Sequence, residues 1–337
     1  MACARGDEVH VGMVHAARAA IAGVAVKTPL IASRCLDVAA KHPVFLKLET
    51  LQPVGAFKVR GAANALSRLD AEQRARGVVC CSTGNHGRGV AYAGRRLGVK
   101  ATVCLSSLVP DVKVRAIEAL DATVVRVGRS QDEAQHEVGR LVREEGLTDI
   151  PPFDHPAVVA GQGTIALEIL EDRPEIETIL VPLSGGGLIG GIALAAKALK
   201  PSIRIIGISM ARGAAMQASL KAGRPVEVEE LPTLADSLGG GIGLENCWTF
   251  GLCRNLVDEV VLLDEAEIYR GMRTLLLEER LVVEGAAAVG HAALLAGKVK
   301  LDGPAAIIVS GQNAPMEQVL AIGRGEAVTL GGLRVKG

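Results

Sequence analysis

The sequence predicts a doubly wound α/β protein, in which helices cover parallel β-sheets. Short runs rich in β-branched residues alternate with longer stretches of helical periodicity, as expected for strand–helix–strand units. Two of these runs lead directly into glycine-rich segments at a helix start. A chain of 337 residues with 49% hydrophobic content is long enough to bury a large core in one or two domains.

The predicted strands are 44–48, 78–82, 101–105, 123–127, 178–183, 204–209, 258–263 and 305–310. Helical patterns fill the gaps, for example over 86–97, 131–145 and 265–279. The two prolines Pro151 and Pro152 oppose helix continuation and favour an extended hinge. We therefore expect the three strands before them to form a smaller lobe, over about 77–150.

Composition argues against several classes of partner. Lys plus Arg and Asp plus Glu both total 37, and aromatic residues make up only 2%, so neither excess positive charge nor base stacking favours nucleic acid. No secretory leader and no apolar run of about 18 residues is present, so we expect no membrane partner and a cytoplasmic location. The seven cysteines lack paired C-x-x-C spacing and are expected to be reduced.

Lys58 is the residue on which the functional interpretation depends. It follows the apolar run 44–48 and a turn containing Pro53 and Gly55, so it lies where a strand pattern gives way to a helix pattern. A lysine at such a junction can form a Schiff base. The alternative is an ordinary solvated lysine at a helix start.

Two glycine-rich segments favour the Schiff base. Residues 82–87 (Ser-Thr-Gly-Asn-His-Gly) and 184–191 (Ser-Gly-Gly-Gly-Leu-Ile-Gly-Gly) each follow a strand and begin a helix. Unpaired N–H groups and the helix dipole stabilise an anion there. Two anion-binding loops and a Schiff-base lysine suit an amino acid held on pyridoxal phosphate.

Each loop also has a competing interpretation. The segment from Gly185 to Gly190 matches G-x-G-x-x-G, but a dinucleotide site needs an acidic residue about 20 positions later, and the next strand ends in Ser209 and Met210. A single phosphate fits better. Residues 82–87 could be a tight turn in which Asn85 tolerates a left-handed backbone and His86 bonds locally.

In the order and content of these segments, residues 21–313 resemble the fold-type II pyridoxal phosphate enzymes, specifically the threonine/serine dehydratase and serine racemase group. The resemblance implies a tryptophan synthase β-like fold with two doubly wound domains and the cofactor in the cleft between them. Residues 77–150 would be a small mobile domain, inserted in a large cofactor-binding domain formed by 1–76 and 151–337. A homodimer is also expected.

The resemblance assigns roles residue by residue. Lys58 would carry the cofactor and act as catalytic base, with Thr83 as a second catalytic group. The cofactor would be bound by Phe57 at the ring, Asn85 at the phenolic oxygen, Gly185, Gly186, Gly187 and Leu188 at the phosphate, Ser310 at the ring nitrogen, and Glu284 beside the ring. The substrate would be bound by Ser82, Thr83, Gly84, Asn85 and His86.

Two of these residues bear on the chemistry. A neutral Ser310 hydroxyl cannot keep the pyridine nitrogen protonated as a carboxylate would. This disfavours a long-lived carbanion at the α-carbon and favours elimination. Ser310 could also be an ordinary strand-end serine, and Glu284 only a favourable first-turn acid. His86 is expected to be structural rather than a proton shuttle.

The chain departs from the metal-activated racemases, which have two carboxylates after the strand near Ser209, where this chain has Gly213 and Ala215. No metal is therefore expected there. The racemases also use a serine at the position of Thr83. The predicted activity is dehydration and deamination of a β-hydroxy α-amino acid to a 2-oxo acid and ammonium, with amino-acid racemisation as the alternative. Segments 152–156 and 232–238 most resemble the hydroxyectoine-utilisation dehydratases.

Overall fold

The computed structural model describes residues 9–82, 84–109 and 111–337, and its main element is a six-stranded sheet. The sheet has the order β1-β2-β10-β7-β8-β9, and β1 pairs antiparallel with β2 whereas the other pairs are parallel. Its strands are β1 (Leu30–Ala32), β2 (Val44–Leu48), β7 (Thr178–Pro182), β8 (Arg204–Met210), β9 (Glu259–Leu263) and β10 (Ala305–Val309).

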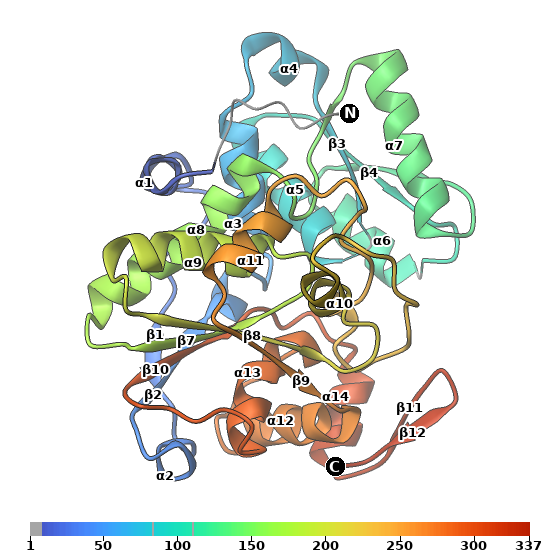
Figure 1. The fold of residues 1–337 in the computed structure, drawn as a ribbon. Helices are drawn as coiled ribbons and strands as arrows, with labels where there is room; N and C mark the ends of the chain where they lie inside the picture. The colour runs from blue at the N-terminus through green and yellow to red at the C-terminus, as the bar shows by residue number, and fades with distance from the viewer. Residues whose placement is uncertain (1–8, 83, 110) are drawn as a thin grey trace.

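Alternate residues of these strands enter two different hydrophobic clusters, which is why the strands are buried on both faces. In β10, Ile307 packs in the cluster with α12 and α13, whereas Ile308 packs in the cluster with α8 and α9. Figure 1 shows these two helix layers on either side of the sheet. The layers contain α8 (Pro156–Asp172), α9 (Gly187–Leu199), α12 (Glu265–Leu277) and α13 (Gly285–Leu295). The expected helix-covered parallel sheet is thereby confirmed.

A second, four-stranded parallel sheet has the order β5-β4-β3-β6 and lies in the upper part of Figure 1. Its strands are β3 (Val78–Cys81), β4 (Ala101–Leu105), β5 (Thr123–Arg126) and β6 (Thr148–Asp149). The expectation of three strands was wrong, because β6 adds a fourth beside β3. Its two residues are too few to show a strand period in the sequence.

Helix α3 (Lys58–Ser67) and the small sheet share one hydrophobic cluster, which contains Val59 and Leu66 of α3 and Val78 of β3. The core is therefore continuous across residue 77. The division into 1–76 with 151–337 and a mobile 77–150 remains a prediction.

The remaining elements connect these layers or flank them. They are α1 (Val11–Ala20), α2 (Asp37–Ala40), the 3-10 helices η1 (Glu49–Leu51) and η2 (Asp236–Leu238), α4 (Ala71–Arg76), α5 (Asn85–Leu97), α6 (Asp111–Glu118), α7 (Gln131–Glu145), α10 (Ala215–Ala222), α11 (Thr249–Leu256), α14 (Met316–Gly323), and the hairpin β11 (Val328–Leu330) and β12 (Leu333–Val335).

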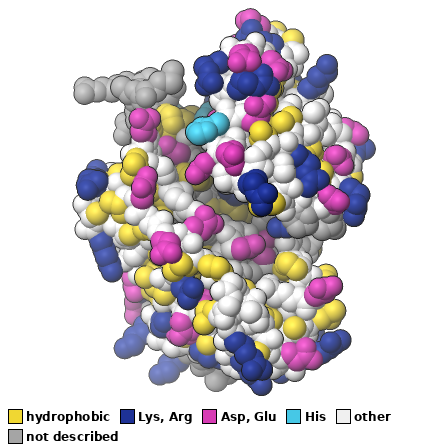
Figure 2. Space-filling model, turned by 90° about the vertical axis from the view of Figure 1, so that its right-hand side faces the viewer, with side chains coloured by type: hydrophobic (Ala, Val, Ile, Leu, Met, Phe, Trp, Pro, Cys, Tyr) yellow, Lys and Arg dark blue, Asp and Glu magenta, His cyan; other side chains and the backbone are white. Residues whose placement is uncertain are grey.

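The surface in Figure 2 intersperses Lys and Arg with Asp and Glu side chains, in keeping with the balanced composition. In the described part of the chain, no helix is both long and apolar enough to cross a membrane. Five cysteines are free thiols: Cys35, Cys80, Cys81, Cys104 and Cys253.

Candidate active site

Lys58 is the first residue of α3, as the strand-to-helix junction predicts, although η1 intervenes after β2. Its Nζ donates to the carbonyl oxygen of Pro152 at 2.7 Å and lies 5.3 Å from the centre of the Phe57 ring. Burial lowers the pKa of this amine to about 8, and the negative charge of Glu284 partly opposes that shift. A larger fraction of the amine is therefore neutral, and so nucleophilic, than in an exposed lysine.

A buried ionic network holds α3 in place two residues after Lys58. The Arg60 guanidinium, 1% exposed, donates to both carboxylate oxygens of Glu49 at 2.8 Å and to those of Glu168 at 2.6 and 2.9 Å. Lys47 Nζ also donates to Glu168, at 2.5 Å. Bidentate pairing fixes both the position and the orientation of Arg60, and hence of the first turn of α3.

The turn after β10 joins the Lys58 segment to the start of α13. The carbonyl oxygen of Ser310 accepts from the N–H of Phe57 at 3.0 Å, and that of Gly311 accepts from the N–H of Glu284 at 3.2 Å. A Cβ on Gly311 would lie 2.7 Å from the Glu284 carboxylate. Ser310 is 2% exposed. The structure thus brings together Phe57, Lys58, Ser310 and Glu284, which come from segments far apart in the sequence.

Glu284 precedes the first residue of α13, but its side chain does not cap that helix. It accepts instead from Asn85 Nδ2, at 2.9 and 3.0 Å to its two oxygens. Asn85 Oδ1 in turn accepts from Asn313 Nδ2 at 2.7 Å, and Arg88 donates to Asn313 at 2.6 Å. Burial raises the pKa of Glu284 to about 7, although the Asn85 hydrogen bond opposes the shift. Glu284 therefore does more than an ordinary first-turn acid, because its side chain binds Asn85 and leaves the helix N-terminus uncapped.

The residues predicted to bind substrate lie in the loop before α5 and in its first two residues, Asn85 and His86. Gly84 N–H donates to Ser82 Oγ at 3.3 Å, and Thr83 lies outside the described residues. His86 Nε2 lies 2.7 Å from the Ile150 carbonyl, which can only accept, so Nε2 carries the proton. Burial, with the nearby charge of Lys58, lowers the pKa of His86 to about 3, so the imidazole is neutral. The substrate roles of Ser82, Thr83 and Gly84 remain predictions.

The glycine-rich loop between β7 and α9 has the conformation that its sequence predicts. Gly186 has a φ of +89° and precedes the first helical residue, Gly187, with no side chain to cap the helix. A Cβ on Gly185 would come 2.5 Å from the Phe153 ring, and one on Gly187 would come 2.9 Å from Phe153 Cα. Only glycines therefore fit in the segment that leads into α9. A segment without side chains leaves the N–H groups at the start of α9 open to a phosphate.

Residues 152–153 connect this loop to the lysine, because Pro152 accepts from Lys58 and Phe153 packs on the glycines. The residues therefore fit pyridoxal phosphate: a buried amine for the aldehyde, a glycine loop for the phosphate, and Asn85, Glu284 and Ser310 for the ring. The sequence alone predicted no role for the Pro152 carbonyl, Phe153 or Asn313. No local pattern distinguishes them, because their roles depend on contacts distant in the sequence.

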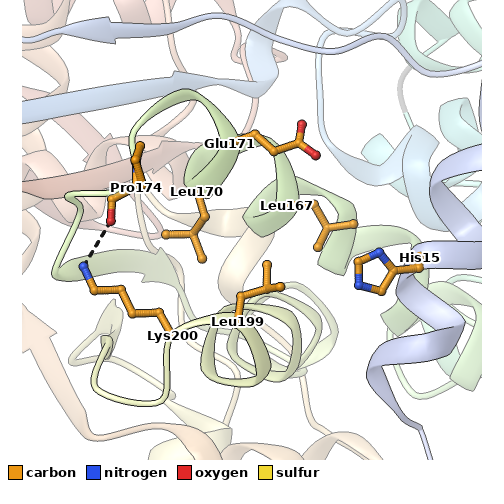
Figure 3. A pocket seen from close by; sticks show the side chains of 7 residues that line it. All are labelled: His15, Leu167, Leu170, Glu171, Pro174, Leu199 and Lys200. Carbon is orange, nitrogen blue, oxygen red and sulfur yellow. Dashed lines mark hydrogen bonds between the residues drawn. The ribbon is translucent and has the colours of Figure 1, made fainter.

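An apolar hollow lies elsewhere, between α1, α8 and α9 (Figure 3). It is lined by His15, Leu167, Leu170, Glu171, Pro174, Leu199 and Lys200. Lys200 donates to backbone carbonyls and Glu171 accepts from Arg18, so these two charged groups already have partners. None of the predicted site residues lines this hollow.

Comparison with known proteins gives one consistent result. The family described as pyridoxal-phosphate dependent enzyme matches residues 21–311. A Sinorhizobium fredii protein provisionally named threonine dehydratase is 56% identical over 86% of this chain and 88% of its own length. The L-threonine ammonia-lyase of Thermotoga maritima is 40% identical over 87% of this chain and 73% of its own.

The structure of maize serine racemase superimposes with a TM-score of 0.88 and 34% identity, covering 93% of this chain and 96% of that one. These matches confirm the fold class predicted from the sequence. The chain belongs to the family of pyridoxal-phosphate dependent enzymes and is a lyase of the threonine dehydratase type.

Proposed function

We propose that this enzyme converts a β-hydroxy α-amino acid to a 2-oxo acid and ammonium. The observation that carries the proposal is the partly buried Lys58 amine, with its pKa lowered to about 8, connected through Pro152 and Phe153 to the glycine loop. The relatives named threonine dehydratase and L-threonine ammonia-lyase support this reaction class.

When bound, pyridoxal phosphate supplies an electron-withdrawing ring conjugated to the substrate amine, which makes the α-proton acidic. We propose that Lys58 anchors it, that Gly185, Gly186, Gly187 and Leu188 bind its phosphate, and that Phe57, Asn85, Glu284 and Ser310 contact its ring. The Asn85 amide already donates to Glu284, so these two residues would position the phenolic oxygen together.

With the substrate amine in its place on the cofactor, the Lys58 amine would be free to act as the base that takes the α-proton. A pKa of about 8 leaves roughly a tenth of the Lys58 amine neutral at pH 7, far more than the ordinary lysine pKa allows. The β-hydroxyl takes a proton and leaves as water. The Lys58 amine would then return to the cofactor and release the product as a free enamine, which tautomerises to an imine that water hydrolyses to the 2-oxo acid and ammonium. We propose that Ser82, Thr83, Gly84, Asn85 and His86 hold the substrate carboxylate.

The Ser310 hydroxyl favours elimination over racemisation, because a neutral group does not keep the pyridine nitrogen protonated and so does not prolong the life of a carbanion at the α-carbon. Racemisation is the second candidate, since maize serine racemase shares the fold at 34% identity. A panel of serine, threonine, threo-3-hydroxyaspartate and a hydroxyectoine-derived hydroxy-diaminobutyrate tests both. We expect ammonium and 2-oxo acid from one of them, and neither from Lys58→Ala. An enantiomer accumulating without ammonium would overturn the proposal in favour of a racemase.

We also propose that residues 77–150 move toward the rest of the chain when substrate binds. Asn85 and Arg88 of this segment contact Glu284 and Asn313 outside it, so these contacts would respond to such a motion.

A homodimer and a cytoplasmic location complete the proposal. Light scattering of the purified protein tests the first, and cell fractionation tests the second.

A further inference from the structure

Three metal-ligating side chains from distant parts of the sequence meet outside the candidate active site. Cys35 lies between β1 and α2, Glu279 follows α12, and His291 is on α13. Cys35 Sγ lies 3.2 Å from Glu279 Oε1 and 3.6 Å from His291 Nε2, and those last two atoms are 3.7 Å apart.

The His291 imidazole is fully buried, and hydrogen bonding explains its position poorly. Its Nδ1 has no partner among the described residues. Its Nε2 is 3.7 Å from the Glu279 oxygen, which is too long for a hydrogen bond, and its other contact is the weak acceptor and donor Cys35 Sγ. A buried ring nitrogen held only by so weak a contact needs a further explanation, and an ion bound at Nε2 supplies one, with Nδ1 then carrying the proton.

The three distances suit one tetrahedral ion. Zinc binds thiolate at about 2.3 Å and imidazole or carboxylate at about 2.0–2.2 Å, so tetrahedral geometry separates its ligand atoms by about 3.4–3.6 Å. The observed 3.2, 3.6 and 3.7 Å bracket this range. A thiolate, an imidazole and a carboxylate together favour zinc over the hard cations magnesium and calcium.

The surroundings hold the carboxylate ligand in place, as second-shell groups do at metal sites. Ser33 Oγ donates to Glu279, and Arg34 N–H donates to it at 3.0 Å. Cys35 is only partly buried, which leaves a route from solvent and a fourth position for water. We propose that Cys35, Glu279 and His291 bind one zinc ion. The ion would link the segment 33–36 to α13, the helix that begins after Glu284.

The test uses the purified holoenzyme, stripped with a chelator and freed of excess cofactor. Equilibrium dialysis against zinc, read by mass spectrometry of the metal, should give one ion per chain. We expect at least a tenfold loss of affinity in Cys35→Ser and in Glu279→Gln. Cys253→Ser, which alters another buried free thiol, is the matched control and should bind as the parent does. Cobalt should give a thiolate charge-transfer band in the parent and not in Cys35→Ser.

Failure of the parent to bind zinc would mean that the three side chains are only hydrogen-bonded. Equal binding by the parent and Cys35→Ser would place the ion elsewhere. If Cys35→Ser does not fold, as judged by circular dichroism, alkylation of the parent decides. Zinc should slow the reaction of Cys35 with iodoacetamide, followed by peptide mass spectrometry, and an unchanged rate would overturn the proposal.

Discussion

Asn85 Nδ2 lies 2.9 and 3.0 Å from the two carboxylate oxygens of Glu284, a residue 199 positions later in the sequence. The amide belongs to the first residue of α5, the helix after β3, and the carboxylate to the residue that precedes α13. The pair therefore joins the small sheet to the helix layer of the large sheet. It also holds the buried Glu284 carboxyl close enough to the Lys58 amine for the charge of each group to shift the pKa of the other.

Glu284→Gln should change how the stability of the cofactor-free protein depends on pH. The pKa of Glu284 is raised from 4.5 to about 7 by burial, so folding favours the protonated form. That contribution is complete below the unfolded pKa and is lost as the pH rises through about 7. Gln resembles the protonated acid, so the variant should match the parent near pH 4 and be more stable above pH 7.

The difference should reach at most about 3 kcal/mol, measured by urea unfolding across this range. Glu317→Gln, which changes an exposed acid on α14, is the control and should show no such pH dependence. A stability difference between parent and Glu284→Gln that is independent of pH would contradict the raised pKa.

The rate at which cofactor-free protein captures pyridoxal phosphate should rise with pH, with a midpoint near pH 8 and a plateau about one pH unit higher. The attacking Lys58 amine must be neutral, and burial lowers its pKa to about 8. Because the Glu284 charge raises that pKa, Glu284→Gln should shift the rise to lower pH. Stopped-flow absorbance measures both profiles, and a midpoint near the ordinary lysine value would show that the amine is solvated.

Lys58→Ala should lose both the covalent attachment of the cofactor and the base that takes the α-proton. We expect the absorbance band of the attached cofactor to disappear and turnover to fall by at least roughly 10²–10⁴-fold. Lys27→Ala removes an exposed lysine and should leave both unchanged. Near-normal turnover of Lys58→Ala without added amine would refute the central assignment.

Gly186→Ala should weaken cofactor binding more than backbone strain alone explains. Its Cβ would lie 2.8 Å from Met216 Cε and 2.9 Å from Cys253 Sγ, in a loop with a φ of +89°. Gly223→Ala is the matched control, since Gly223 has a φ of +72° with no atom within 4 Å of its Cβ. Both should lose about 1–2 kcal/mol of stability to strain.

Only Gly186→Ala should raise the dissociation constant for pyridoxal phosphate, measured by fluorescence titration. If the two variants bind cofactor equally well, the phosphate does not lie at this loop.

Ser310→Asp should shift the partition between elimination and α-proton exchange. A carboxylate within about 4–6 Å would raise the pKa of the ring nitrogen, which lengthens the life of the deprotonated α-carbon. The ratio of deuterium exchange at that carbon to 2-oxo acid formation should therefore increase. Ser310→Asn, neutral and of similar size, should leave it unchanged. The same ratio in both variants, with cofactor bound, would show that charge at Ser310 does not control the partition.

Local signals were sufficient for much of this protein. The strand over 101–105 and the helix over 131–145 have the bounds that the sequence predicts, because periodicity and turn residues act over a few positions. The same is true of Lys58 and of the two glycine loops, which lie at helix starts because a strand and a turn precede each. Strands β1 and β6 were missed, since two or three residues carry no period.

The tertiary structure alone decided which distant side chains meet. Nothing in the segments around Pro152, Asn313 or Cys35 indicates their partners, because those contacts depend on how strands cross over in the sheets. It likewise decided the pKa values of Lys58 and Glu284, which are set by burial and by each other. Sequence determines which groups are available and their local geometry. Folding determines their neighbours and their solvation, and with these their charge.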